Sequence, residues 1–161
     1  MSTSDKNDIG SALGRIVSGA FIVTAAKGDE RTGFLASWIQ QASFEPPMVT
    51  LAVKRDRSIR GLLDAGASFV VNVLAEDDQT LFGHFAKGFA PGEDAFVGIS
   101  ATDGVLGVPI LSEALACLEC KIVGSWEAGD HVVYVGEVAA GAVGNDEAAP
   151  QTRVRKSGFT Y

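Results

Sequence analysis

The feature that most constrains the fold is a series of short, β-branched apolar runs that are separated mostly by turns. These runs cover residues 21–26, 34–39, 48–53, 68–74, 115–126 and 132–139. Helical spacing of apolar residues is confined to residues 9–18, 59–65 and 77–86. Because strands and helices do not alternate strictly, the pattern argues against a doubly wound parallel sheet. It predicts a mainly β fold, a small closed antiparallel barrel with short peripheral helices, since closure removes apolar sheet edges.

Several runs predict more specific features. The near-continuous apolar run 48–53 is typical of a central strand that is covered on both faces. The runs 115–126 and 132–139 predict paired strands joined by a turn at 127–131. Residues 87–107 are rich in glycine and have no stable period, so they predict a loop long enough to carry function.

Length and charge limit the classes of protein that fit. The 161 residues predict a single domain over 1–161, with a flexible N-terminal segment at 1–8. The net charge of −7 provides no general attraction to nucleic acid or to an anionic membrane. No apolar stretch approaches the length of a membrane span, and the polar opening lacks a signal-peptide apolar region. We therefore expect a cytoplasmic protein.

The two cysteines form a C-x-x-C pattern at Cys117 and Cys120, which can indicate thioredoxin-like redox chemistry. Their surroundings read as a strand, where this odd spacing places the two side chains on opposite faces. We therefore expect packing thiols. The sequence contains no G-x-G-x-x-G motif, Walker loop or G-x-S-x-G elbow, and its only histidines are His84 and His131. A histidine-rich metal centre is excluded, and no metal site is predicted.

Three polar features interrupt the apolar pattern. The first places Ser37, Gln40, Gln41 and Ser43 before a Pro-Pro stop, and it fits either a binding edge or a solvated loop. The second, Lys54-Arg-Asp-Arg-Ser58, leads into a predicted helix and fits either a phosphate cradle or a plain Ser58 N-cap with solvated cations. The third, Gly129-Asp-His131, fits either a site or an ordinary turn.

The order of several motifs resembles the flavin reductase-like family, whose fold is an antiparallel, Greek-key-like, FMN-binding split β-barrel. The motifs are Gly33-Phe-Leu-Ala-Ser-Trp, Ser43-Phe-Glu-Pro-Pro-Met-Val49, Phe69-Val-Val-Asn-Val-Leu74 and Gly129-Asp-His131. Three further segments resemble the C-terminal flavin reductase domain of cyanobacterial flavodiiron proteins. They are residues 89–96, residues 109–120 and the ending Arg155-Lys-Ser-Gly-Phe-Thr-Tyr161.

This resemblance implies a site and an activity. It implies that the isoalloxazine edge of FMN lies along Ala36, Ser37, Trp38, Gln41, Ala42 and Ser43. It also implies that the phosphate is held by Lys54, Arg55 and Ser58, and that His131 lies near the flavin and nicotinamide. Trp38 and Gln41 stand where small or hydroxyl residues are frequent in the family, so Trp38 either covers the pocket or packs.

The function implied is an NAD(P)H-dependent flavin reductase that transfers hydride from NAD(P)H to flavin N5 and passes electrons to a flavin or protein acceptor. FAD is a candidate exchanging substrate, a homodimer is expected, and a flavodiiron or flavodoxin-like protein is a candidate acceptor. The alternatives are a non-catalytic FMN-binding electron-transfer module of a flavodiiron-type system and a purely structural barrel.

Overall fold

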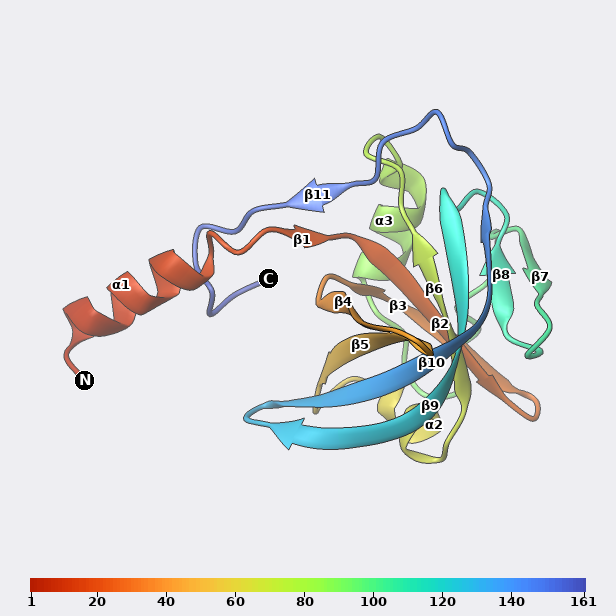
Figure 1. Cartoon of the computed structure of the whole chain (residues 1–161), viewed down its shortest axis with the longest axis horizontal. Helices are drawn as coiled ribbons and strands as arrows, with labels where there is room; N and C mark the ends of the chain where they lie inside the picture. The colour runs from red at the N-terminus through yellow and green to blue at the C-terminus, as the bar shows by residue number, and fades with distance from the viewer.

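In the computed structural model, which describes residues 1–161, one seven-stranded antiparallel sheet curls around a hydrophobic core (Figure 1). The strands follow the order β3, β2, β6, β9, β10, β5 and β4 across this sheet. Their bounds are β2 Phe21–Lys27, β3 Glu30–Ala36, β4 Ile39–Phe44, β5 Pro47–Lys54, β6 Ser68–Val73, β9 Ala116–Ala128 and β10 His131–Val143. The mainly β prediction is confirmed.

The sheet is not closed by hydrogen bonds, because its edge strands β3 and β4 do not pair with each other. The prediction of a closed barrel is therefore wrong, and the open seam is that of a split barrel. Ser37 and Trp38 connect the two edge strands and lie outside both of them. The Trp38 carbonyl still accepts a hydrogen bond of 3.0 Å from the Ala52 amide, which holds the connection against β5.

Smaller elements surround the curled sheet. They are β1 Ser18–Gly19 paired with β11 Thr152–Arg153, β7 Ala101–Asp103 paired with β8 Pro109–Leu111, and the helices α1 Thr3–Leu13, α2 Arg60–Asp64 and α3 Gln79–Ala86. The acidic start predicted for α3 is confirmed, since Asp78 caps this helix by accepting a hydrogen bond from the Leu81 amide. No helix is long and apolar enough to cross a membrane.

The first helix differs from the expectation. It spans Thr3–Leu13 rather than 9–18, and residues 3–8 of the segment expected to be flexible lie within it. The reason is a capping box, in which the Ser2 hydroxyl accepts from the Asp5 amide while the Asp5 carboxylate accepts from the Ser2 amide. The capping box therefore starts the helix at Thr3, whereas the apolar spacing alone predicted a start at residue 9.

Helix α1 and the C-terminal segment lie together to one side of the barrel (Figure 1). The Gly158 amide donates to the Gly10 carbonyl at 2.6 Å, and the Arg155 amide donates to the Gly14 carbonyl at 3.2 Å. The last residues of the chain are thus attached to the first helix before they turn back toward the sheet.

Strand β5 is not a central strand covered on both faces. It lies second from one edge of the sheet, and its burial alternates along the strand. Val49, Leu51 and Val53 are buried in the core, whereas Thr50 and Ala52 are half-buried on the outer face. The apolar character of the outer face made the run look continuous, since alanine does not distinguish an inner position from an outer one.

The predicted pairing of the two late strands is confirmed. Strands β9 and β10 pair along their length, and Gly129, with φ +62°, supplies the left-handed residue of the turn between them. Cys117 and Cys120 are free, buried thiols on β9 that belong to two different apolar clusters. The prediction of packing thiols is confirmed.

Candidate functional site

Three neighbouring cavities lie where residues 54–58, the β3–β4 connection and the C-terminal segment meet. The Ser58 cavity, of about 380 Å³, is lined by Arg57, Ser58, Lys87 and Phe89 among others. The Ser37 cavity, of about 250 Å³, is lined by Ser18, Ala36, Ser37, Arg57, Arg155 and Tyr161 among others. The His131 cavity, of about 400 Å³, is lined by Trp38, Lys54, Asp130, His131, Arg155 and Tyr161 among others. Because Arg57 borders the first two cavities and Arg155 and Tyr161 border the last two, the three form one continuous site.

The Ser58 cavity combines a hydroxyl with two cations. The Ser58 hydroxyl donates to the Phe89 carbonyl at 2.7 Å, which leaves its oxygen free to accept. Ser58 is not the N-cap of α2, since Ile59 holds that position without a side-chain cap. Lys87 and Phe89 come from the glycine-rich loop, so the segment predicted to carry function forms one wall of this cavity.

Arg55 does not reach any of the three cavities. Its side chain turns toward the β9–β10 turn, where Nε donates to the Gly129 carbonyl at 2.9 Å. Its two terminal nitrogens contact the Glu127 carboxylate at 3.2 and 3.1 Å. The structure therefore separates Arg55 from Ser58, although the two residues are three apart in the chain.

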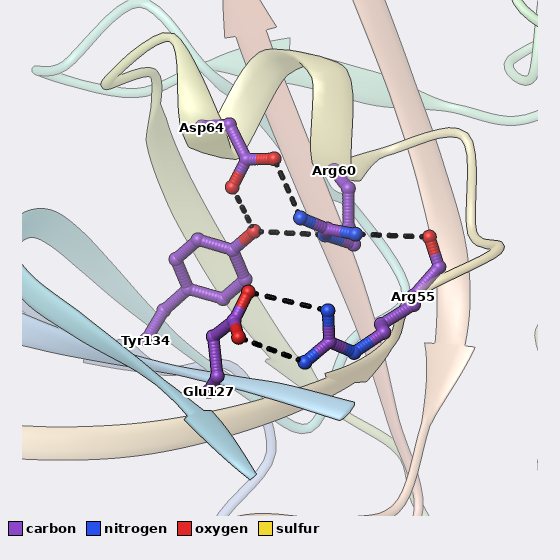
Figure 2. A network of polar contacts seen from close by, with 5 residues as sticks. All are labelled: Arg55, Arg60, Asp64, Glu127 and Tyr134. Carbon is purple, nitrogen blue, oxygen red and sulfur yellow. Dashed lines mark hydrogen bonds and ion pairs between the residues drawn. The ribbon is translucent and has the colours of Figure 1, made fainter. Parts of the chain in front are cut away.

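Figure 2 shows that Arg55 belongs to a structural network. Arg60 donates to the Arg55 carbonyl at 3.0 Å and forms an ion pair with Asp64 at 2.9 Å. The buried Tyr134 hydroxyl donates to Asp64, and burial raises the pKa of this phenol. The network joins β10 and the β9–β10 turn to α2, and so fixes the turn that leads into His131.

The Ser37 cavity is strongly cationic within an acidic protein. Arg57, Arg153 and Arg155 all line it, and none of its lining residues is acidic. None of these three arginines forms an ion pair within the chain. Because an arginine at a concave, partly buried surface is stabilised by a counter-ion, the cavity suits an anionic ligand.

Two buried polar atoms at this cavity have no hydrogen-bond partner. They are the Ser18 hydroxyl oxygen and Nε of Arg155. Buried polar atoms are normally paired, because an unsatisfied one costs about 1–3 kcal/mol. Such atoms at the wall of a cavity indicate that a ligand completes the site.

The His131 cavity contains a linear hydrogen-bonded chain. His131 Nδ1 lies 2.7 Å from an Asp130 carboxylate oxygen, and Nε2 lies 2.6 Å from the Tyr161 hydroxyl. The bond to His131 lowers the pKa of Asp130, whereas burial raises the pKa of Tyr161. An ionised carboxylate can only accept, so Nδ1 carries a proton, and in the neutral ring Nε2 accepts from Tyr161.

Aromatic contacts cover the same histidine. The Trp38 ring centroid lies 4.7 Å from that of His131 and 5.7 Å from that of Tyr161. The Arg155 guanidinium lies over the Trp38 ring, 5.0 Å from the ring centroid. His131 is only 7% exposed as a result, and its Nε2 is hydrogen-bonded to the Tyr161 hydroxyl rather than open to solvent.

The structure brings some of the predicted site residues together and leaves others apart. Ala36, Ser37, Trp38, Lys54, Ser58 and His131 line the continuous site. Gln41, Ala42 and Ser43 lie on edge strand β4 and line none of its cavities. Arg57, Arg155 and Tyr161 were not assigned a role from the sequence, although all three lie within segments that it singled out.

The chain belongs to the flavin reductase-like family, since the model of the flavin reductase like domain matches residues 13–157. The family resemblance is thereby confirmed. Residues 13–157 include every site residue named in this subsection except Tyr161.

Two similar curated proteins show which members of the family this chain resembles. The chain is 44% identical over 155 residues to the putative diflavin flavoprotein A 3 of Nostoc sp. and 42% identical over 156 residues to the diflavin flavoprotein A 1 of Synechocystis sp.. These alignments cover 96% of this chain but only 27% of each relative, so the chain spans about a quarter of the length of these curated relatives.

Solved structures of similar size share the fold. The NADH:FAD oxidoreductase SgcE6 of Streptomyces globisporus C-1027 superposes with a TM-score of 0.83 and 29% identity, covering 89% of this chain and 85% of that one. The flavin reductase HpaC complexed with NADP+ superposes with a TM-score of 0.78 and 29% identity, covering 91% of both chains. The split-barrel fold is therefore shared with flavin reductases over nearly the whole length.

Proposed function

We propose that this chain is an FMN-binding NAD(P)H:flavin oxidoreductase, which transfers hydride from NAD(P)H to flavin N5 and passes the electrons to a flavin or protein acceptor. The observation that carries the proposal is the continuous site, cationic at the Ser58 and Ser37 cavities and closed by His131 at the other end. A structure of SgcE6 holds NAD and FAD fragments, which supports flavin and nicotinamide as the two ligands.

The residues present fit a flavin mononucleotide. Arg57 and the Ser58 hydroxyl offer a charged and a neutral partner for a phosphate, and Lys87 adds a second cation. Ala36 and Ser37 line the adjoining cavity, where backbone groups and the Ser37 hydroxyl are suited to the polar edge of a flat ring. The unpaired atoms of Ser18 and Arg155 provide further donors at the same cavity.

Bound FMN would supply the hydride-accepting ring, and the protein would supply position and exclusion of water. Trp38 lines the His131 cavity and offers an aromatic surface at the seam of the barrel. Asp130 holds His131 in one tautomer, and Nε2, which accepts from Tyr161 here, would accept from the nicotinamide once that hydroxyl is displaced. It would orient the substrate there by a hydrogen bond, since hydride transfer itself requires no base.

A homodimer forms part of the proposal. A groove of about 640 Å³ on the outer face of the sheet is lined mostly by apolar residues, including Ala52, Val133 and Trp126. Ile16 and Val17 at this groove are 64% and 61% exposed, and such a patch is suited to a second copy. Gln41 lies on the edge strand at this groove, so the predicted flavin contacts of residues 41–43 would require the dimer.

Anaerobic stopped-flow absorbance tests the proposed function. Purified protein loaded with FMN is mixed separately with NADH and NADPH, and bleaching of the flavin absorbance is followed. Reduction by either nucleotide supports the reductase and also establishes which nucleotide is preferred. If neither nucleotide reduces the bound flavin, the reductase is refuted, and reduction by a protein donor alone would then establish the electron-transfer module. A protein that does not quench FMN fluorescence would be a structural barrel.

A second measurement addresses the acceptor. After reduction, the protein is mixed with free FMN, with FAD or with a flavodiiron or flavodoxin-like protein, and reoxidation of the bound flavin is timed. Rapid exchange with free FAD would identify it as a substrate, whereas electron transfer without exchange would identify FMN as a resident group.

A further inference from the structure

Apart from one donor on Arg155, the ending Arg155-Lys-Ser-Gly-Phe-Thr-Tyr161 has no role in the proposed function so far, yet it borders the site at two cavities. Arg155 and Tyr161 each line both the Ser37 and the His131 cavity. Arg155 is held from several sides, since its amide donates to the Gly14 carbonyl and Nη1 donates to the Thr160 carbonyl at 3.3 Å. Its position is therefore defined before any ligand binds.

The charge of Arg155 is not neutralised within the chain. It forms no ion pair, and its Nε is buried without a hydrogen-bond partner. The guanidinium lies over the Trp38 ring at 5.0 Å, a contact that orients the group but does not neutralise its charge. A fixed, uncompensated cation at the wall of a cavity favours whichever form of a ligand carries more negative charge.

We propose that Arg155 is a tuning residue for the flavin, which stabilises the reduced form over the oxidised form. This inference rests on the proposed function. Hydride transfer breaks the C4–H bond of the nicotinamide and forms an N–H bond on the flavin. Two electrons and one proton arrive together, so the flavin gains one negative charge while the nucleotide becomes NAD(P)+. A cation that borders the Ser37 and His131 cavities interacts more strongly with the flavin after this transfer than before it.

The phosphate is assigned to a different part of the site, which separates the two kinds of cation. Arg57 and Lys87 line the Ser58 cavity, whereas Arg155 does not, although Arg57 also reaches the Ser37 cavity that Arg155 lines. A cation that only anchors the phosphate stabilises oxidised and reduced FMN equally, because the charge of the phosphate is the same in both. A cation beside the ring instead shifts the midpoint potential of the bound flavin. This difference makes the potential the deciding measurement.

The test compares Arg155→Gln with Arg155→Lys in the full chain. Lys156→Gln is the matched control, because it removes the same charge from the adjacent, exposed residue that lines none of the three cavities. The dissociation constant of oxidised FMN is measured by fluorescence quenching, and the midpoint potential of bound FMN by an anaerobic dye-coupled titration. Melting temperatures confirm that each variant is folded.

We expect Arg155→Gln to weaken the binding of reduced FMN about tenfold more than the binding of oxidised FMN. This difference lowers the two-electron midpoint potential of the bound flavin by about 30 mV. Arg155→Lys retains most of the wild-type potential, and Lys156→Gln leaves it unchanged. An unchanged potential in Arg155→Gln, or an equal loss of affinity for both forms, overturns the proposal. Should Arg155→Gln fail to fold, a potential for Arg155→Lys as low as that of free FMN overturns it instead. If the wild-type chain binds no FMN, it is the proposed function that fails.

Discussion

The sharpest prediction concerns which cation of the run 54–58 holds the flavin phosphate. Arg57 lines the Ser58 cavity and the Ser37 cavity and has no carboxylate partner within the chain. Arg55 is already paired with Glu127 and with the Gly129 carbonyl. We therefore expect Arg57→Ala, and not Arg55→Ala, to weaken the binding of FMN.

The magnitude follows from the bond that is lost. A hydrogen bond to a charged group contributes about 1.5–3 kcal/mol, which corresponds to about a 10- to 150-fold increase in the dissociation constant. The Ser58 hydroxyl and Lys87 remain in Arg57→Ala, so we expect a value in the lower half of this range. Because the interaction is ionic, the loss should shrink as the salt concentration rises.

Fluorescence quenching of FMN and of riboflavin provides the assay. Riboflavin lacks the phosphate, so Arg57→Ala should change its affinity by less than about threefold, well below the effect of a charged hydrogen bond. Arg15→Ala is a control of equal charge change at an exposed position outside all three cavities. Equal losses for FMN and riboflavin would show that Arg57 contacts the ring or supports the fold. A larger loss of FMN affinity in Arg55→Ala than in Arg57→Ala would refute the assignment.

Three further predictions follow from packing and hydrogen bonding. Gly136→Ala should destabilise the protein by about 1–3 kcal/mol in urea unfolding, because its Cβ would lie 2.5 Å from a buried aromatic ring. In Gly124→Ala on the same hairpin, the added Cβ has no atom within 4 Å, so the free energy of unfolding should change by less than about 0.5 kcal/mol. Equal losses of stability in the two variants would contradict the packing argument. Burial raises the pKa of Cys120 to about 12, so its thiol should not react with Ellman's reagent at pH 8 unless the protein is denatured. Tyr161→Ala should lower the KM for the nicotinamide nucleotide by about two- to tenfold, because the nucleotide then no longer has to displace the Tyr161 hydroxyl from His131 Nε2. A higher KM would instead show that Tyr161 contacts the substrate.

The sequence predicted the strands well because burial imposes a strong pattern on them. The runs 21–26 and 68–74 lie within or next to β2 and β6, where buried apolar residues are nearly continuous. The run 34–39 began too late to mark the start of the second strand, because β3 already begins at Glu30. The residues at that end of β3 are exposed, so their polar composition resembles a turn although they pair fully with β2.

Closure of the barrel could not be predicted from burial. Edge strand β4 carries mostly exposed side chains, and a bulge lies between Gln41 and Ser43. Its membership of the sheet depends on backbone hydrogen bonds to β5, which any sequence without proline can form. The open seam between β3 and β4 was therefore implied only by the family resemblance and not by the apolar pattern, and it is this seam that places Ser37 and Trp38 at the site.

The choice between Arg55 and Arg57 shows a second limit of sequence reasoning. The basic run identified the right loop, but neighbouring arginines in a loop have no periodicity that assigns one to a cavity. The assignment depends instead on where carboxylates lie in space. Glu127 is 72 residues away from Arg55 in the chain and contacts it directly.

The positions of paired and unpaired arginines distinguish the candidate site from its surroundings. In a chain with net charge −7, carboxylates are more abundant than cations, so most cations could find a partner. The structure nevertheless keeps Arg57, Arg153 and Arg155 together at one cavity without an ion pair, while Arg55 and Arg60 are paired on the other side of the same loop. Clustering three like charges costs electrostatic free energy in the empty protein, and an anionic ligand would recover it on binding. The paired arginines thus support the fold, and we propose that the three arginines clustered at this cavity mark where the anionic ligand binds.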